Sequence, residues 1–205
     1  MGLNKHESGT FLSISEGRII RRYETEVKGK TVSRVNKLGK TVHEEKFDDI
    51  EGIISDVRFK PDTSGKGYGD QYTLIIKDVN DTYNINMQQD SRYATSFLKC
   101  LPNVDLKKPI RLMPWSMQDK NNATKMITGI TMWQGGDKIQ PAYSKENPNG
   151  LPEMKKVKLR GKDTWDSFEM NSFLKDMALK LFEVVPTDEP VSPSVVVRDD
   201  TKVPF

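Results

Sequence analysis

The sequence predicts a mainly β protein with a small Greek-key barrel at its centre, and three observations support this class. Short segments in which polar and apolar residues alternate, the period of a β-strand, follow one another from residue 50 to residue 133. One short segment with helical spacing interrupts them, after three strands and before two more. Glycine, asparagine and aspartate separate the strands, as tight turns require. Three strands, a helix and two strands is the order of the OB-fold, a five-stranded Greek-key barrel.

The strands and the helix of this barrel can be placed along the chain. Pro102 ends the helix, because proline cannot continue one. Since the helix falls between the third and fourth strands, it would plug the bottom of the barrel. A fold with a four-stranded sheet and two helices would place its helices at other positions in the sequence, so this pattern does not fit it. We expect strands at 50–59, 71–79, 82–87, 109–117 and 125–133, and the helix at 91–101.

Alternation within the strands predicts which side chains share a face. In the first strand it places Ile53 with Val57 on one face and Ile54 on the other. In the second strand, Tyr72 falls on the core face and Lys77 on the opposite face. In the last two strands, one face carries Arg111, Met113, Trp115 and Met117, and correspondingly Lys125, Ile127, Thr131 and Trp133.

Further elements are expected on both sides of the barrel. An N-terminal β extension, residues 11–47, reads as two hairpins, the first with its turn at Glu16-Gly17. Beyond residue 134 the chain reads as loop until a C-terminal helix at 164–182, which has an apolar stripe and Asp163 as its N-cap. We expect this helix to pack on the barrel, with an oligomer seam as the alternative.

These elements divide the chain into three parts. Residues 1–185 would form the OB-fold domain with its extension and helix. Residues 186–198 contain three prolines and few bulky groups, so they are expected to be a flexible linker. Residues 199–205 form a short acidic tip that ends in Pro204 and Phe205.

Composition and charge favour a polyanion-binding protein. The chain has 205 residues, 35% of them hydrophobic and 30% charged, and a mean hydropathy of −0.64. It lacks a long apolar run and a signal-peptide pattern, so we expect no membrane partner and a cytoplasmic location. The single Cys100 fits a reducing compartment. The whole chain carries +3 and the segment from Pro186 onward carries −2, which leaves +5 on the body.

Catalysis finds little support in the residues. The chain has only His6, His43 and one cysteine, too few for a tetrahedral metal site of those ligands. The glycine-rich segment GKGYG at 65–69 lacks the spacing of a phosphate-binding loop. We therefore expect no cofactor, no metal and no enzymatic activity.

Basic and aromatic residues on the predicted barrel suggest binding of a single-stranded nucleic acid. Lysine neutralises phosphate, and an aromatic ring stacks on any base for about 1–3 kcal/mol. The loop between the first two barrel strands combines such residues with glycines, and so does the exposed face of the last two strands. Tryptophan is more often a core residue than a stacking platform, so that alternative stays open. The expected DNA-binding residues are Arg21, Arg22, Arg58, Lys60, Lys66, Tyr68, Lys77, Arg111, Trp115, Lys125 and Trp133.

The last residues resemble the C-terminal tip of bacterial single-stranded DNA-binding proteins, which end in an acidic run followed by Ile-Pro-Phe. The matching positions are Asp199, Asp200, Val203, Pro204 and Phe205, with valine in place of isoleucine. The resemblance implies that the tip docks on replication and repair partners, with the Phe205 ring in an apolar pocket and its carboxylate on a basic side chain. Lys202 and the short linker depart from the family pattern. The layout looks more like that of a bacteriophage-encoded single-stranded DNA-binding protein.

We therefore expect a non-enzymatic protein that coats single-stranded DNA during replication, recombination or repair and recruits partners through its tip. Two alternatives stay open: an OB-fold adaptor that binds proteins, and a barrel that binds RNA, since nothing here reads a 2′-hydroxyl. A nuclease ranks below both, because no set of metal-binding carboxylates can be recognised. The sequence leaves the oligomeric state open between monomer and dimer.

Overall fold

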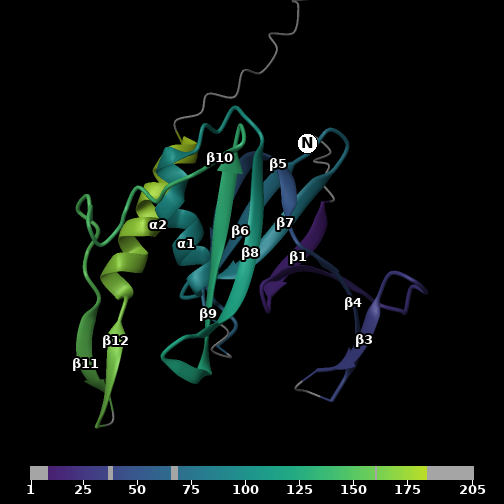
Figure 1. Cartoon of the computed structure of the whole chain (residues 1–205), viewed down its shortest axis with the longest axis horizontal. Helices are drawn as coiled ribbons and strands as arrows, with labels where there is room; N and C mark the ends of the chain where they lie inside the picture. Colours follow the sequence, from purple (N-terminus) through teal and green to yellow (C-terminus); the bar gives the residue numbers. More distant parts are fainter. Residues whose placement is uncertain (1–8, 37–38, 66–68, 160, 184–205) are drawn as a thin grey trace, which may run out of the picture.

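A computed structural model of the chain describes residues 9–36, 39–65, 69–159 and 161–183, which form a mainly β protein with two α-helices (Figure 1). The helices are α1 (Arg92–Cys100) and α2 (Phe168–Glu183), and a 3-10 turn, η1 (Leu101–Asn103), follows α1. No helix in the described ranges is long and apolar enough to cross a membrane. The strands are β1 (Thr10–Ser15), β2 (Arg18–Tyr23), β3 (Val32–Val35), β4 (Thr41–Phe47), β5 (Ile50–Lys60), β6 (Gln71–Lys77), β7 (Thr82–Gln88), β8 (Ile110–Asp119), β9 (Asn122–Gln134), β10 (Asp137–Lys138), β11 (Lys155–Leu159) and β12 (Lys162–Asp166).

The predicted order of three strands, a helix and two strands is present as β5, β6, β7, α1, β8 and β9. The helix begins where expected, because the Ser91 side chain accepts a hydrogen bond from the Ala94 amide and caps its first turn. It ends at Cys100, and Pro102 lies in the 3-10 turn that follows. The residues that flank this segment therefore set the bounds of α1.

Strands β1 to β10 form one sheet in the order β10-β9-β8-β5-β6-β7-β1-β2-β4-β3. Among β5 to β9, the antiparallel pairs are β5–β6, β6–β7, β5–β8 and β8–β9, which leaves β7 and β9 at the two ends of the group. Within the described residues β7 pairs in parallel with β1, and β9 pairs with β10. The five central strands are thus part of a larger sheet, and a pairing of β7 with β9 is not among its ladders.

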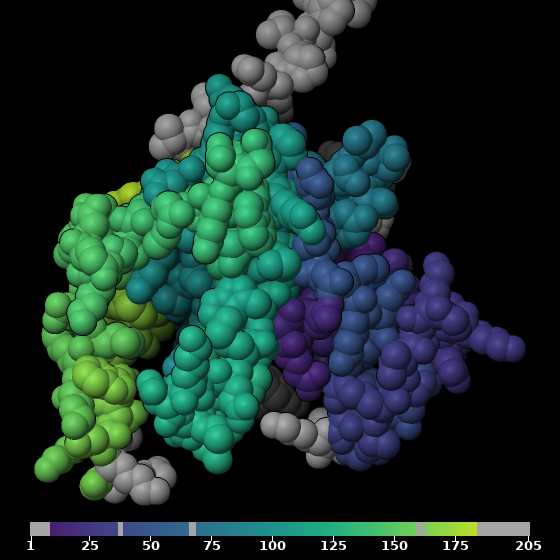
Figure 2. Space-filling model, viewed as in Figure 1, coloured from purple at the N-terminus to yellow at the C-terminus, as the bar shows by residue number. Residues whose placement is uncertain are grey.

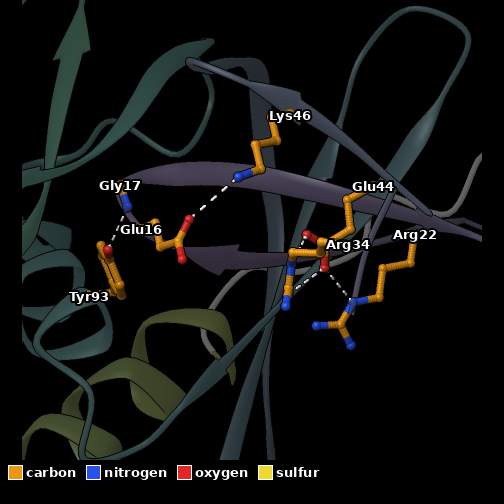
Figure 3. A network of polar contacts seen from close by, with 7 residues as sticks. All are labelled: Glu16, Gly17, Arg22, Arg34, Glu44, Lys46 and Tyr93. Atoms are coloured by element: carbon orange, nitrogen blue, oxygen red, sulfur yellow. Dashed lines mark hydrogen bonds and ion pairs between the residues drawn. The ribbon is translucent and has the colours of Figure 1, made fainter. Parts of the chain in front are cut away.

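The turn between β1 and β2 connects the N-terminal extension to the central strands. Gly17 has φ +75°, and a Cβ there would lie 2.5 Å from the Ser116 backbone nitrogen in β8. Its amide donates a 2.8 Å hydrogen bond to the buried hydroxyl oxygen of Tyr93 in α1 (Figure 3). The sheet therefore curves far enough for its N-terminal hairpin to contact both β8 and α1.

One hydrophobic core joins the extension, the central strands and both helices. Leu12 and Ile19 bring β1 and β2 into this core, so the extension is integral to the fold. The helix α2 buries Met170, Leu174 and Ala178 and contacts both α1 and β5, as expected for a helix packed on the sheet. The other buried members are Ile54, Val57, Tyr72, Leu74, Ile76, Ile85, Met87, Tyr93, Ala94, Phe97, Leu98, Cys100, Leu101, Ile110, Leu112, Ile130 and Met132.

Two local predictions were wrong. In β5, Ile54 is buried and Ile53 is 39% exposed, the reverse of the grouping of Ile53 with Val57. The register with β6 shifts between Ile54 and Asp56, and this bulge inserts one extra residue and reverses the phase of alternation. Ser55 occupies the bulge, and its hydroxyl donates to the Ile75 carbonyl.

The second error concerns the start of α2. Residues expected to be loop, together with residues 164–166 of the expected helix, form the β11–β12 hairpin. Asp163 pairs with Lys158 in this hairpin and therefore cannot cap a helix. The helix begins at Phe168, and the Asp166 side chain accepts a hydrogen bond from the Phe168 amide at 2.9 Å.

A buried carboxylate holds the β2–β3–β4 part of the sheet together (Figure 3). Glu44 in β4 is 1% exposed and accepts hydrogen bonds from Arg34 in β3 at 2.7 and 2.8 Å, and from Arg22 in β2 at 3.3 Å. The Arg34 hydrogen bonds hold the pKa of Glu44 below its ordinary value. A buried charge with three charge-assisted hydrogen bonds links three neighbouring strands.

We expect Glu44→Gln to lower the free energy of unfolding at pH 7 by about 1–3 kcal/mol, because it weakens these hydrogen bonds. The folded-state pKa of Glu44 is depressed, so its contribution is present above pH 4.5, its ordinary pKa, and is lost as the pH falls through the lower folded value. Urea unfolding at pH 7 and pH 3 should show the difference between wild type and variant shrinking in acid. Glu24→Gln, an exposed substitution of the same kind, should change little.

We expect Tyr93→Phe to destabilise the protein by about 1–3 kcal/mol, because the buried Gly17 amide loses its acceptor. Tyr143→Phe removes the same atom from a tyrosine whose ring packs on Phe173 and serves as the matched control. The measurement is urea unfolding of both variants. Equal stability of the two would show that the Gly17 contact does not hold the β1–β2 turn.

Candidate nucleic-acid interface

The exposed face of the β8–β9 hairpin brings four of the predicted residues onto one surface. The predicted alternation is confirmed, since Ile110, Leu112 and Pro114 are buried and the residues between them are not. Across the two strands, Arg111 lies opposite Trp133, and Trp115 lies opposite Gly129. At about 3.3 Å per residue, the stripe is about 20 Å long. We call it the outer stripe: Arg111, Met113, Trp115, Met117, Lys125, Ile127, Thr131 and Trp133.

Trp115 is seated on the backbone of the neighbouring strand. A Cβ at Gly129 would lie 2.6 Å from the Trp115 Cζ2 and 2.9 Å from its Cε2, so the indole ring occupies the space that any other residue would fill. The ring is half-buried and the glycine is buried. This contact restricts the ring before any ligand arrives, and a restricted ring loses less entropy on stacking.

Arg111 and Trp133 combine a guanidinium group and an indole ring at the other end of the stripe. They line an open hollow of about 570 Å³ together with Pro109 and Glu51. One guanidinium nitrogen of Arg111 donates to Asp49 at 2.6 Å, and this hydrogen bond raises the pKa of Arg111. Arginine has five N–H donors, so the guanidinium can still bind a phosphate beside Asp49.

A second hollow, of about 370 Å³, adjoins this end and contains Arg21. Its guanidinium lies 4.9 Å above the ring of Tyr23, a cation–π arrangement. The Tyr23 hydroxyl donates to Glu45 at 2.6 Å, which raises the pKa of Tyr23. Tyr83 and Phe47 add two further rings, and Glu51 lines both hollows. Aromatic side chains therefore continue from the outer stripe across the end of β5.

The remaining predicted residues are dispersed. Arg22 binds Glu44, and Arg58 pairs with Asp56 at 2.7 Å on its own strand, so both charges are partly neutralised within the protein. Lys77 is exposed at the end of β6, and Lys60 lines a hollow of about 210 Å³ beside the β5–β6 loop. Lys125 lies near the tip of the β8–β9 hairpin, 3.9 Å from Asp119. The predicted residues Lys66, Tyr68, Asp199, Asp200, Val203, Pro204 and Phe205 lie outside the described residues.

Sequence reasoning missed two groups of residues. Tyr23, Phe47 and Tyr83 come from three separate strands, and no local pattern connects them. Trp165 is 62% exposed on β12, at a position where the sequence predicted the start of the C-terminal helix. The alternation of lysine with Val157 and Leu159 before Gly161 was the available signal for that hairpin.

Comparison with protein families, with characterised proteins and with solved structures finds no match. In the part of the chain that the structure describes, no three histidine, cysteine, aspartate or glutamate side chains come together as a possible metal site.

We expect Gly129→Ala to displace the Trp115 ring, because the new methyl group would lie within 3 Å of two ring atoms. The expected loss of stability is about 1–3 kcal/mol, with a change in tryptophan emission. In a Trp115→Ala background the same substitution should have little effect. A double-mutant cycle by urea unfolding measures this coupling, and additive effects would contradict the contact.

Proposed function

We propose that this protein binds single-stranded DNA without sequence preference, coats it during replication or recombination, and recruits partner proteins through its C-terminal tip. The observation that carries the proposal is the outer stripe. It aligns a guanidinium group, two indole rings and a lysine on one exposed face. Stacking tolerates any base and phosphate contacts carry no sequence information, so such a face suits nonspecific binding.

The proposed architecture is an OB-like barrel built from β5 to β9 with the β1–β2 hairpin as an additional wall. Element order supports it, and so does the pairing of β5 with both β6 and β8, which bends one long strand between two parts of the sheet. The contact of Gly17 with β8 and α1 would close the wall that β7 leaves open. OB-folds bind oligonucleotides on an exposed strand face and its adjoining loops.

The proposal also assigns a role to the C-terminal tip. The tip at 199–205 would dock on replication or recombination proteins, since its acidic pair and its Val-Pro-Phe residues resemble the docking tip of bacterial single-stranded DNA-binding proteins. We propose no catalytic step, because the face offers stacking and charge but no nucleophile with a partnered base. A bacteriophage origin and a bacterial cytoplasmic setting belong to the same proposal and rest on the resemblance of the tip.

The test is a fluorescence titration with poly-dT at several salt concentrations. We expect quenching of tryptophan emission and an affinity that falls as salt rises, by a logarithmic slope of about 0.7 for each phosphate contact. Trp133→Ala should weaken binding by about 5- to 150-fold, the equivalent of one lost stacking contact.

Phe11→Ala is the matched control, because Phe11 is 67% exposed on β1, a strand whose ladders are with β2 and β7. It should leave the affinity unchanged. Absent quenching, or an affinity indifferent to salt, would overturn the proposal. Removal of 199–205 should leave binding of poly-dT intact and abolish recruitment of partners.

A further inference from the structure

A cleft opens at the end of the molecule where the β8–β9 and β11–β12 hairpins stand apart, with α1 visible between them (Figure 2). It has a volume of about 440 Å³. Arg92 and Lys99 of α1 line it, and so do Thr128 of β9 and Trp165 of β12. We call it the Trp165 cleft. None of these four residues belongs to the outer stripe.

We infer that the Trp165 cleft binds a second segment of the same single-stranded DNA that occupies the outer stripe. A base would stack on Trp165, and the phosphates beside it would bind Arg92 and Lys99. This inference rests on the proposed function and extends it. The bound strand would pass around the edge of β9 from one face of the hairpin to the other.

Trp165 has the exposure that a stacking platform needs. Its side chain is 62% exposed on β12, whereas Trp115 and Trp133 are only partly exposed. Its pairing partner across the hairpin is Lys156, whose ammonium binds Asp163 at 2.7 Å. A large indole ring left in water is unfavourable, and a stacked base would cover it.

The cations of the cleft lack carboxylate partners. Arg92 and Lys99 are seven residues apart, which places them on one side of α1 and about 10 Å apart along its axis. Neither forms an ion pair with another residue in the described ranges. By contrast, Lys155 and Lys156 of the nearby hairpin bind Glu169 and Asp163 at 2.6 and 2.7 Å. The cleft therefore holds two cations without ion-pair partners beside one lining carboxylate, that of Asp90.

The edge of β9 links the cleft to the outer stripe. The Ile130 amide donates to the Ser96 hydroxyl of α1 at 2.8 Å, and the Met132 carbonyl accepts from the Ile139 amide at 2.9 Å. Alternation along a strand aims the backbone N–H and C=O of Thr128 to the same side, toward the cleft. Thr128 directly precedes Gly129, on which Trp115 lies, so one strand separates the two surfaces.

The surroundings of Trp165 favour a nucleic acid over a peptide. A groove that binds an amphipathic peptide is walled by apolar side chains at several successive positions. In the Trp165 cleft, Met154 and Met170 are the other apolar side chains of comparable size, and Ser167 and Asn171 lie among them. These polar groups can bond base edges, while the cations suit phosphates.

The decisive experiment labels the three tryptophans with 5-fluorotryptophan and follows their 19F resonances during titration with dT30. Each resonance is assigned by its loss in the corresponding Trp→Phe variant. We expect both Trp133 and Trp165 to shift on saturation. If Trp133 shifts and Trp165 does not, the inference is overturned and the proposed function stands. If neither shifts, both fall; a shift of Trp165 alone supports the cleft and contradicts the outer stripe.

A second measurement separates direct contact from a distant conformational effect. Trp165→Ala should weaken binding of dT30 by about 5- to 150-fold. Arg92→Gln with Lys99→Gln should lower the salt slope by about 1.4, the value for two phosphate contacts. The control is Lys28→Gln with Lys40→Gln, the same charge change in the connections that flank β3, on the other side of the molecule (Figure 1). Equal salt slopes for the two double variants would overturn the inference.

Discussion

The parallel pairing of β1 with β7 is the constraint on which the rest of the architecture depends. Residues 10–13 pair with residues 83–86. Strands β1 and β7 are therefore neighbours in the sheet, although all of β2 to β6 separates them in the sequence. This pairing occupies the edge of β7 and carries β2 round to the position where Gly17 meets β8 and α1. Because β7 pairs with β1, the edge of β9 away from β8 contacts α1 at Ile130 and the short strand β10 near Trp133. The two surfaces proposed to bind DNA lie on either side of that edge.

Positive charge in this chain is only partly available for a ligand. Arg22 and Arg34 are held by the buried Glu44, Arg58 by Asp56, and two hairpin lysines by neighbouring acids. Summed charge therefore overstates the electrostatic attraction of the β2–β4 region and of β5. In the β8–β9 hairpin and in the Trp165 cleft, cations lie beside exposed or half-exposed indole rings, where one strand could engage both.

Features that depend on neighbouring residues were predicted correctly from the sequence. Features that depend on contacts between distant segments were not. The burial of β8 followed from simple alternation, and the helix α1 followed from its apolar spacing and from Pro102 at its end. The face on which Ile53 lies was predicted wrongly, because the bulge at Ser55 is a property of the β5–β6 pair and not of β5 alone. The parallel β1–β7 ladder joins segments too far apart for any local period to show. For the same reason the aromatic groups of β2, β4 and β7 could not be recognised as neighbours, whereas Arg111 and Trp133 could, since a single hairpin connects them.

Trp115 and Trp165 would hold a stacked base in two physically different ways. Trp115 is packed on the Gly129 backbone, so it would bind with little loss of side-chain entropy but presents only part of its surface. Trp165 is largely exposed on a two-stranded hairpin, so it offers more area and must lose more freedom. A strand that reached both would be held by a preformed platform and an adaptable one. The preformed platform would fix where the strand lies, and the adaptable one would accommodate the differing sizes of purines and pyrimidines, as the proposed coating of any sequence requires.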